Sequence, residues 1–282
     1  MSIVQSIMNK PITISKESTV SDVIRELRNK KISRLLVLDG KTCNSIITEK
    51  DLGLFLLTDN TERKLEQISI SEIMKPLCSI NASTSIKECA QNLIENSIGS
   101  LAIHSNSTID GLITKTDLTK YFAENYSGKK IVGEYATWYY AWAYSDTPLY
   151  KVVRKMINEK ISRIILRNHN EVPEGILAFR DLFGVALGEG NYETVVDSSN
   201  PVIPVIFTRK GFLSETGFGA TTTAEQIMTS KIIAVNYDDD LAQACKVLIG
   251  NKINAVAVLS RTGNIIGILS KTDITRALAF LN

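Results

Sequence analysis

The sequence predicts an α+β protein made of four tandem copies of one small unit with α/β-type strand and helix order. Three patterns support this prediction: a short signature recurs four times, an apolar landmark precedes each copy, and an amphipathic helix pattern precedes each landmark. A repeat of this kind determines the fold of the whole chain. The signature copies occupy residues 48–52, 114–118, 178–182 and 270–274.

The three patterns keep a nearly constant register along the chain. The Asp of each signature lies 19 or 20 residues after the first Ile of the apolar landmark. An Ile-Met pair, replaced by Tyr-Ala in the third copy, ends 43 or 45 residues before the same Asp. Such agreement over four copies indicates a true repeat. The landmarks occupy residues 32–37, 98–103, 161–166 and 253–258.

Each unit is predicted to run strand, helix, strand, strand, helix over about 60 residues. In the first copy, residues 11–14 form a short strand, and four apolar residues between Val20 and Leu27 then recur at the spacing of one helix face. The landmark supplies the next strand, a turn at 39–41 closes a hairpin, and the signature starts the last helix.

The length of the unit predicts that units pair. A chain of about 60 residues buries little apolar surface alone, so four units should form two pairs. The first pair is expected at 1–127, with repeats at 1–62 and 67–127, and the second at 128–282, with repeats at 128–188 and 224–282. Residues 189–223 form an insertion, whose apolar stretch at 202–207 is expected to pack on the body of the protein.

Both tryptophans of the chain lie in one aromatic stretch at 138–144, which replaces the ordinary first strand of the third repeat. One interpretation is that these side chains fill the core between the two pairs. The other is that they form a platform on which a nucleobase stacks. The sequence leaves both interpretations open.

Composition excludes several classes of function. A net charge of +2 predicts no broad basic surface for nucleic acid. No apolar run approaches the roughly 18 residues of a membrane span, and the N-terminus does not resemble a signal peptide, so a cytoplasmic location is expected. The four cysteines lack C-x-x-C spacing. Cys89 and Cys245 fall on apolar helical positions, which predicts free core thiols in a reducing compartment.

Catalytic chemistry and metal binding have little support in the sequence. There are only two histidines, His104 and His169, and both are expected in turns or at the surface. No Ser-His-Asp set, phosphate-binding loop or metal-ligand cluster is evident. We therefore expect no enzyme activity, no catalytic residue and no metal site.

The signature itself has two interpretations. A Thr or Ser three residues before an Asp forms a helix capping box, which needs no ligand. However, Lys50 and Arg180 immediately precede the Asp in the first and third repeats, where a cation opposes the helix dipole. Arg34 and Arg163 occupy one landmark position in the same two repeats. Cations at both positions are thus confined to the odd repeats, which indicates bound anions.

The repeat resembles the CBS (cystathionine-beta-synthase) domain. The resemblance rests on Ile-Met near the start, Ile-Ser-Arg-Leu-Leu-Val in the middle and Gly-Leu-Ile-Thr-Lys-Thr-Asp-Leu at the end of the unit. Four copies without another domain are similar to the gamma regulatory subunits of AMP-activated protein kinase and their stand-alone archaeal relatives. This resemblance implies two Bateman modules with pseudo-two-fold symmetry, and ligands with adenosyl groups in the clefts between paired repeats.

The chemistry of a nucleotide matches parts of the signature. A carboxylate can accept both ribose hydroxyls, and a phosphate suits a helix N-terminus that carries a hydroxyl. By resemblance, such hydroxyl and carboxylate pairs are Thr48/Asp51, Thr114/Asp117 and Ser270/Asp273. Asp181 keeps the carboxylate, but Ala178 lacks the hydroxyl. The first strands, which include Ile14 and Ile80, are expected to supply an apolar slot for adenine.

The best two nucleotide sites are predicted where cations of an odd repeat reach the signature of the following even repeat. The first combines Thr114 and Asp117 with Arg34 and Lys50. The second combines Ser270 and Asp273 with Arg163 and Arg180.

These features predict a regulatory sensor of AMP, ADP or ATP that needs no obligatory cofactor. The sensor would pass its ligand state to an unknown partner, such as a kinase, a transporter or an enzyme. One alternative is a sensor of S-adenosylmethionine, against which the four cations argue. Another is an interaction scaffold whose sites are vestigial. The oligomeric state, including a homodimer, stays open.

Overall fold

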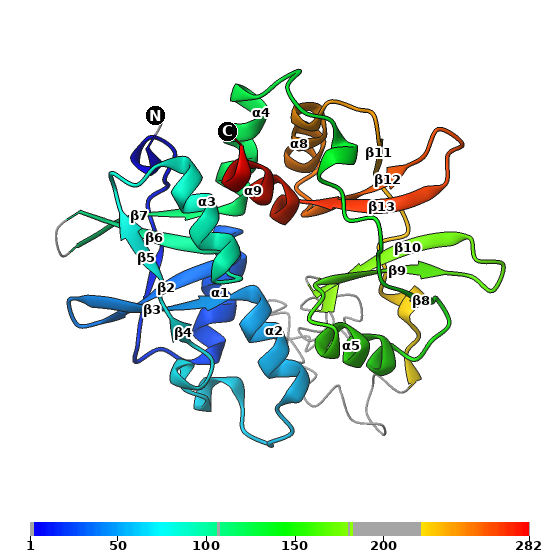
Figure 1. Cartoon of the computed structure of the whole chain (residues 1–282). Helices are drawn as coiled ribbons and strands as arrows, with labels where there is room; N and C mark the ends of the chain where they lie inside the picture. Colours follow the sequence, from blue (N-terminus) through cyan, green and yellow to red (C-terminus); the bar gives the residue numbers. More distant parts are fainter. Residues whose placement is uncertain (1–2, 106–107, 180, 183–220, 282) are drawn as a thin grey trace, which may run out of the picture.

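The computed structural model describes residues 3–105, 108–179, 181–182 and 221–281 (Figure 1). Arg180 and the stretch at 202–207 lie outside these residues. The first two repeats consist of the predicted elements in the predicted order. The first contains β1 (Thr13–Ser15), α1 (Val20–Lys30), β2 (Arg34–Asp39), β3 (Thr42–Thr48) and α2 (Glu49–Thr58). The second contains β5 (Ser79–Asn81), α3 (Ile86–Glu95), β6 (Ser100–Ser105), β7 (Thr108–Thr114) and α4 (Lys115–Asn125).

The second half of the chain repeats the same plan. The third repeat contains β8 (Trp142–Tyr144), α5 (Leu149–Asn158), β9 (Arg163–Arg167) and β10 (Pro173–Ala178). The fourth contains β11 (Ala234–Asn236), α8 (Leu241–Gly250), β12 (Ala255–Leu259), β13 (Ile265–Ser270) and α9 (Lys271–Phe280). In each sheet the first strand runs parallel to the second, and the second and third form an antiparallel hairpin. The predicted α+β repeat is confirmed.

The helices form where capping and apolar periodicity coincide. Thr19 and Asp22 close a capping box at the start of α1, and Ser85 and Glu88 do so at α3. The apolar face that the spacing predicts in α1 is buried from Val20 to Leu27. Helices α1 and α3 therefore satisfy part of their first backbone N–H groups locally, and each buries its apolar face.

The repeats pair by exchanging the segments that precede their first strands. We call these the lead-in segments, residues 3–12, 68–78, 131–141 and 221–233. Asn9 of the first lead-in pairs with Leu112 in β7 of the second repeat. In return, the short strand β4 (Lys75–Pro76) of the second lead-in pairs with β3 of the first repeat. The third and fourth repeats exchange segments in the same way, through Thr137 with Ile268 and Thr229 with Ile176.

Glycines in the last hairpin strands leave room for this exchange. A Cβ on Gly111 or Gly175 would collide with Met8 or Met228 of the incoming lead-in. A Cβ on Gly267 would lie 2.8 Å from the Thr137 carbonyl oxygen. The lead-in backbone or its Met side chain thus occupies the space that a larger residue would need at each of these positions.

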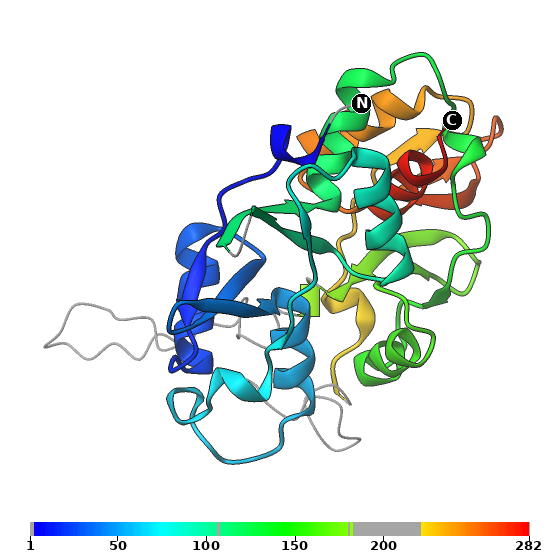
Figure 2. The ribbon, with the colours of Figure 1, turned by 60° about the vertical axis from the view of Figure 1, so that its left-hand side comes forward.

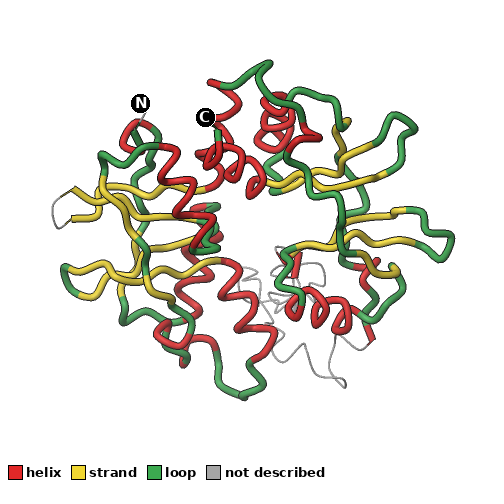
Figure 3. Tube along the Cα trace, in the orientation of Figure 1, coloured by secondary structure: helices red, strands yellow, loops and turns green. Residues whose placement is uncertain are grey.

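The two pairs meet chiefly through helices of the even repeats. Helix α3 packs against α9, and α4 packs against both α8 and α9 (Figure 2). One hydrophobic cluster runs without interruption through the second and fourth repeats. On the other side, Leu57 of α2 is buried in the hydrophobic cluster of the third repeat. Figure 3 shows the strands on the two outer flanks, with α3, α4 and α9 between them.

Two further predictions are settled by burial. Cys89 and Cys245 are free and fully buried, as predicted, and burial raises the pKa of each thiol to about 12.

The aromatic stretch does not fill the core between the pairs, because Trp138, Tyr139 and Trp142 are 42%, 96% and 39% exposed. The third lead-in pairs with β13 at Thr137 and Ile268, and Trp138 lies beside Gly267 there. In the described part of the chain, no helix has the length and apolarity to cross a membrane.

We predict that Gly267→Ala lowers the free energy of unfolding by about 1–3 kcal/mol, because the added methyl group meets a backbone carbonyl that cannot rotate away. Gly250→Ala is the control, since among the described residues beyond its own helix backbone and chain neighbours no atom lies within 4 Å of its Cβ position. That variant should shift stability by less than about 1 kcal/mol, toward higher stability. Urea denaturation measures both changes in the free energy of unfolding. Equal changes for the two variants would contradict the close approach of the Thr137 carbonyl to Gly267.

Candidate ligand-binding cleft and central cavity

The signature Asp is first of all a helix cap. In α4, Oδ2 of Asp117 accepts hydrogen bonds from the Thr114 backbone N–H at 2.9 Å and from its hydroxyl at 2.7 Å. Asp273 receives the matching pair from Ser270 at 2.8 and 2.6 Å. Thr48 and Asp51 make the same box at α2. The structural interpretation of the signature is therefore correct, and it uses one oxygen of each carboxylate.

The second oxygen of the two buried carboxylates faces the partner repeat. Oδ1 of Asp117 accepts a hydrogen bond from Asn9 Nδ2 at 2.9 Å. Oδ1 of Asp273 accepts from Arg276 Nη1 at 2.7 Å and from Thr137 Oγ1 at 3.4 Å. Asn9 and Thr137 are equivalent residues, because each directly follows the Ile-Met landmark or its Tyr-Ala replacement. We did not predict these contacts from the sequence. The position directly after the Ile-Met landmark, which Asn9 and Thr137 share, was the signal that could have identified the two residues.

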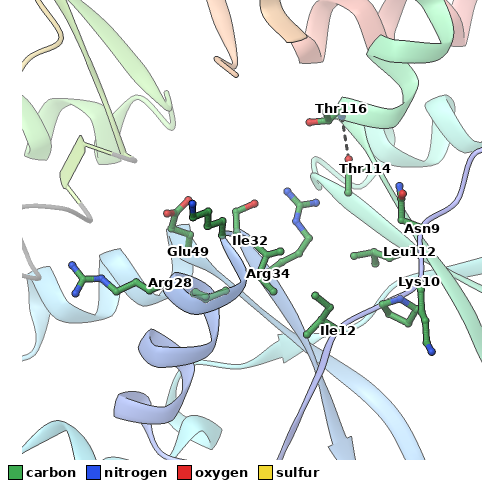
Figure 4. Close-up of a pocket in the computed structure, with 14 residues that line it drawn as sticks. Asn9, Lys10, Ile12, Arg28, Ile32, Arg34, Glu49, Leu112, Thr114 and Thr116 are labelled. Carbon is green, nitrogen blue, oxygen red and sulfur yellow. Dashed lines mark hydrogen bonds between the residues drawn. The ribbon is translucent and has the colours of Figure 1, made fainter. Parts of the chain in front are cut away.

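A cleft of about 590 Å³ lies between the first and second repeats (Figure 4). We call it the first cleft. Its apolar wall includes Pro11, Ile12 and Leu112, and its polar wall includes Arg34 and Thr114. Figure 4 shows Arg34 extending from one wall toward Thr114 on the other. The volume is within the range of small-molecule sites.

Arg34 places a positive charge in this cleft, and a hydrogen bond fixes the position of its guanidinium group. Its Nη1 donates a hydrogen bond to the Gly99 carbonyl oxygen at 3.0 Å. Burial lowers the pKa of the guanidinium, whereas the nearby carboxylates of Asp117 and Glu49 act in the opposite direction. The predicted approach of Arg34 to the second repeat's signature is thus present in the geometry. Arg163 is related to Asp273 in the same way, since burial lowers its pKa and Asp273 opposes that shift.

A second cavity, of about 470 Å³, lies where all four repeats meet. We call it the central cavity. Its lining is rich in cations from every repeat: Arg34, Lys50, Lys115, Arg163, Lys231 and Lys271. The two positions compared in the sequence carry cations in the odd repeats only, and the cavity adds lysines of the even repeats at other positions. Lys115 and Lys271 lie one position earlier in the signature than Lys50, and Lys231 lies in the fourth lead-in.

Lys115 shows the electrostatic cost of gathering these charges. Burial is the largest cause that lowers its pKa, the cations Arg276, Arg163 and Arg34 act in the same direction, and Asp273 opposes them; the resulting pKa is about 8. Near neutral pH the lysine is thus a charged group in a site that disfavours its charge. A bound anion would reverse that preference.

The remaining predicted residues are placed as follows. Lys50 lies over the Phe179 ring, 5.3 Å from its centroid, and Thr48 and Asp181 line the central cavity. Ile14 is buried in the core of the first repeat, and Ile80 packs against the core cluster of the second and fourth repeats. Ile12, two residues before Ile14, lines the first cleft instead. Within the described residues, no group of His, Cys, Asp and Glu is arranged to hold a metal ion.

Comparison with known proteins identifies the repeat. The CBS domain model matches residues 4–56, 70–124, 132–188 and 224–280. The chain belongs to the CBS domain family. This finding covers most of the sequence and confirms the four repeats that were predicted from the spacing of the signature.

Two solved structures share the fold over nearly the whole chain. Protein MJ1225 from Methanocaldococcus jannaschii, proposed as an archaeal homolog of g-AMPK, is 19% identical with a TM-score of 0.78, over 99% of this chain and 100% of that one. An uncharacterized conserved protein from Pyrococcus horikoshii is 16% identical with a TM-score of 0.65, over 98% and 100%. Among curated sequences, the uncharacterized protein MJ1426 of M. jannaschii is 24% identical over 140 residues, covering 48% of this chain and 83% of its own length.

We predict that the stability of the wild type rises relative to that of Lys115→Met between pH 7 and pH 10. The folded-state pKa of Lys115 is about 8, below the 10.5 of an unperturbed lysine. The unfolded chain therefore binds more protons than the folded protein in this pH window. As the pH rises, the charge on Lys115 destabilises the folded protein less, and the free energy of unfolding increases. Chemical denaturation of both proteins across this range measures the difference. A difference independent of pH would contradict the lowered pKa.

Proposed function

We propose that this CBS protein is a regulatory sensor of adenine nucleotides, with Bateman modules at 1–127 and 128–282. The observation that carries this proposal is the first cleft, which is lined by Arg34, by Thr114 and Thr116 at the start of α4, and by Asn9, the hydrogen-bond partner of Asp117. A carboxylate, a cation and a helix N-terminus that carries a hydroxyl are groups suited to a ribose and a phosphate.

Each part of an AMP molecule has a matching wall in the first cleft. The adenine would lie against Pro11, Ile12 and Leu112, which form the apolar side. The ribose hydroxyls would bond to the Asp117 oxygen that Asn9 now contacts. The phosphate would lie at the start of α4, near Thr114 and Arg34.

The charge of the cavity favours a phosphorylated ligand over S-adenosylmethionine. The first cleft opens beside a central cavity whose lining includes six Lys and Arg residues. A phosphate would relieve their mutual repulsion, whereas the sulfonium of S-adenosylmethionine would add to it. Two acidic residues, Glu49 and Asp181, also line this cavity, so its balance stays positive.

A scaffold with vestigial sites explains less of the geometry. Capping accounts for the Thr and Asp of the signature, but α1 and α3 are capped equally well outside the cleft. Capping needs neither Arg34 beside Asp117 nor lysines at the first turn of α4 and α9. These cations oppose the helix dipole, and a phosphate would compensate them.

A ligand can regulate a partner only through its different affinity for two arrangements of the protein. The first cleft is formed by two repeats, so a ligand that bonds to both would favour one angle between them. A kinase, a transporter or an enzyme that contacts the rim of the modules would sense this change.

We predict that Asp117→Ala abolishes the stabilisation of the protein by AMP in the first cleft. At 100 times the dissociation constant, one occupied site raises the free energy of unfolding by about 2.7 kcal/mol. Titration calorimetry and thermal unfolding with AMP, ADP, ATP and S-adenosylmethionine measure the effect and rank the ligands.

Asp22→Ala is the matched control. Asp22 caps α1 with the same pair of hydrogen bonds from Thr19, whereas Asp117 also bonds to Asn9, which lines the cleft. Both variants should lose about 1 kcal/mol of intrinsic stability, and Asp22→Ala alone should keep its nucleotide response. If no adenosyl ligand stabilises the wild type, the scaffold becomes the better account.

A further inference from the structure

The carboxylate of Asp117 keeps room for one more hydrogen bond. Its Oδ2 accepts two bonds from Thr114, and its Oδ1 accepts one from Asn9, which lines the first cleft. Among the described residues, these are the bonds that Asp117 accepts. The two oxygens of a carboxylate together accept about four hydrogen bonds. Oδ1 of Asp117 can therefore accept a ribose hydroxyl without losing a bond that it already makes.

The carboxylate of Asp273 has no such room. Its Oδ2 accepts two bonds from Ser270. Its Oδ1 accepts one from Arg276 Nη1 at 2.7 Å and a long one from Thr137 Oγ1 at 3.4 Å. The side chain of Asp273 is 5% exposed, whereas that of Arg276 is 46% exposed. The guanidinium thus reaches from the surface to a buried acid and fills the acceptor that a ribose would use.

The residue at the matching position of the second repeat leaves its signature acid available. Lys120 and Arg276 each lie three residues after the Asp of their signature. Lys120 is exposed, and it makes no hydrogen bond or ion pair with the part of the chain that the structure describes. An ammonium group is a compact and strongly hydrated charge, whereas a planar guanidinium presents several donors that match a carboxylate. This one difference accounts for the occupied acceptor at Asp273.

A purely structural role for the ion pair of Arg276 and Asp273 explains less. Asp273 already completes the capping box of α9 with Ser270, so the helix does not need Arg276 at its start. Arg163 also acts on Asp273 as a nearby positive charge, so the buried acid is compensated without Arg276. An exposed i,i+3 pair adds little to helix stability. Its clearest consequence is that it occupies the oxygen that the cap leaves free.

We propose that Arg276 competes with the ribose for Asp273, so that the site of Ser270 and Asp273 binds adenine nucleotides more weakly than the first cleft does. A ribose hydroxyl is neutral, and its hydrogen bond would replace a charge-assisted bond of about twice the strength. That difference corresponds to roughly a 10-fold lower affinity. This inference rests on the proposed function, and it adds that the two modules fill over different ranges of nucleotide concentration.

Removal of the arginine in the Asp117→Ala protein tests the competition, because that change disables the first cleft. Titration calorimetry should show that Arg276→Ala strengthens AMP binding about 10-fold. A further Asp273→Ala change should remove that gain. Arg276→Lys is the matched variant, since it keeps the charge and gives the position the residue found in the second repeat. It should show most of the same gain.

The reciprocal change is Lys120→Arg in the wild-type chain. An arginine at this position can reach the acceptor that Asp117 keeps, so AMP binding in the first cleft should weaken about 10-fold. Lys120→Ala is the control, and it should leave the affinity unchanged. Adenosine is the matched ligand, because it carries the same ribose without the phosphate. Its affinity should change with that of AMP in every arginine and lysine variant.

The outcomes are distinct. If Arg276→Ala leaves AMP affinity unchanged or lowers it, the competition is overturned and the proposed function stands. A gain in Arg276→Ala that Arg276→Lys lacks, or one confined to AMP and absent for adenosine, reports a general effect of charge and also overturns the competition. Failure of the wild type to bind any adenine nucleotide overturns both.

Discussion

The exchange of lead-in segments between paired repeats is the constraint on which the rest of the structure depends. One repeat has a small sheet and two helices, which is too little to bury a core alone. By pairing Asn9 with Leu112 and Lys75 with Ile46, the first two repeats share their edges. The same exchange brings Asn9 to Asp117, so the cleft and the pair form together.

The signature carboxylate serves two purposes at once. One oxygen closes the capping box and thereby fixes the rotamer of Asp117 and the direction of α4. The other oxygen is held at the edge of the cleft, where it contacts Asn9. A group that is already fixed by its cap loses little freedom on binding a ribose. This dual use explains why the sequence pattern alone could not decide between a cap and a ligand-binding residue.

The sequence predicted what depends on local periodicity and left out what depends on long-range placement. Repeat order, helix faces and caps follow from spacing over a few residues, and they are present as predicted. The bond from Asn9 to Asp117 joins residues 108 positions apart, and the bond from Lys115 to Thr272 joins residues 157 apart. The repeat shows that these residues occupy equivalent positions, but local spacing does not give the distant residues that they contact. The exposure of Trp138 likewise depends on the outer path of its lead-in, which an aromatic composition cannot reveal.

The distribution of charge links the two modules. The whole chain carries a net charge of only +2, yet six Lys and Arg residues line one cavity of about 470 Å³. Their repulsion acts across the junction at which α4 packs against α9. An anion in the cavity lowers that repulsion, and it therefore favours the arrangement in which the helix N-termini lie close together. A change of ligand charge, such as the loss of one phosphate, would change how strongly the ligand reduces the repulsion between the cations of the two modules. The location of the charges thus provides a physical route from ligand chemistry to the relative position of the modules.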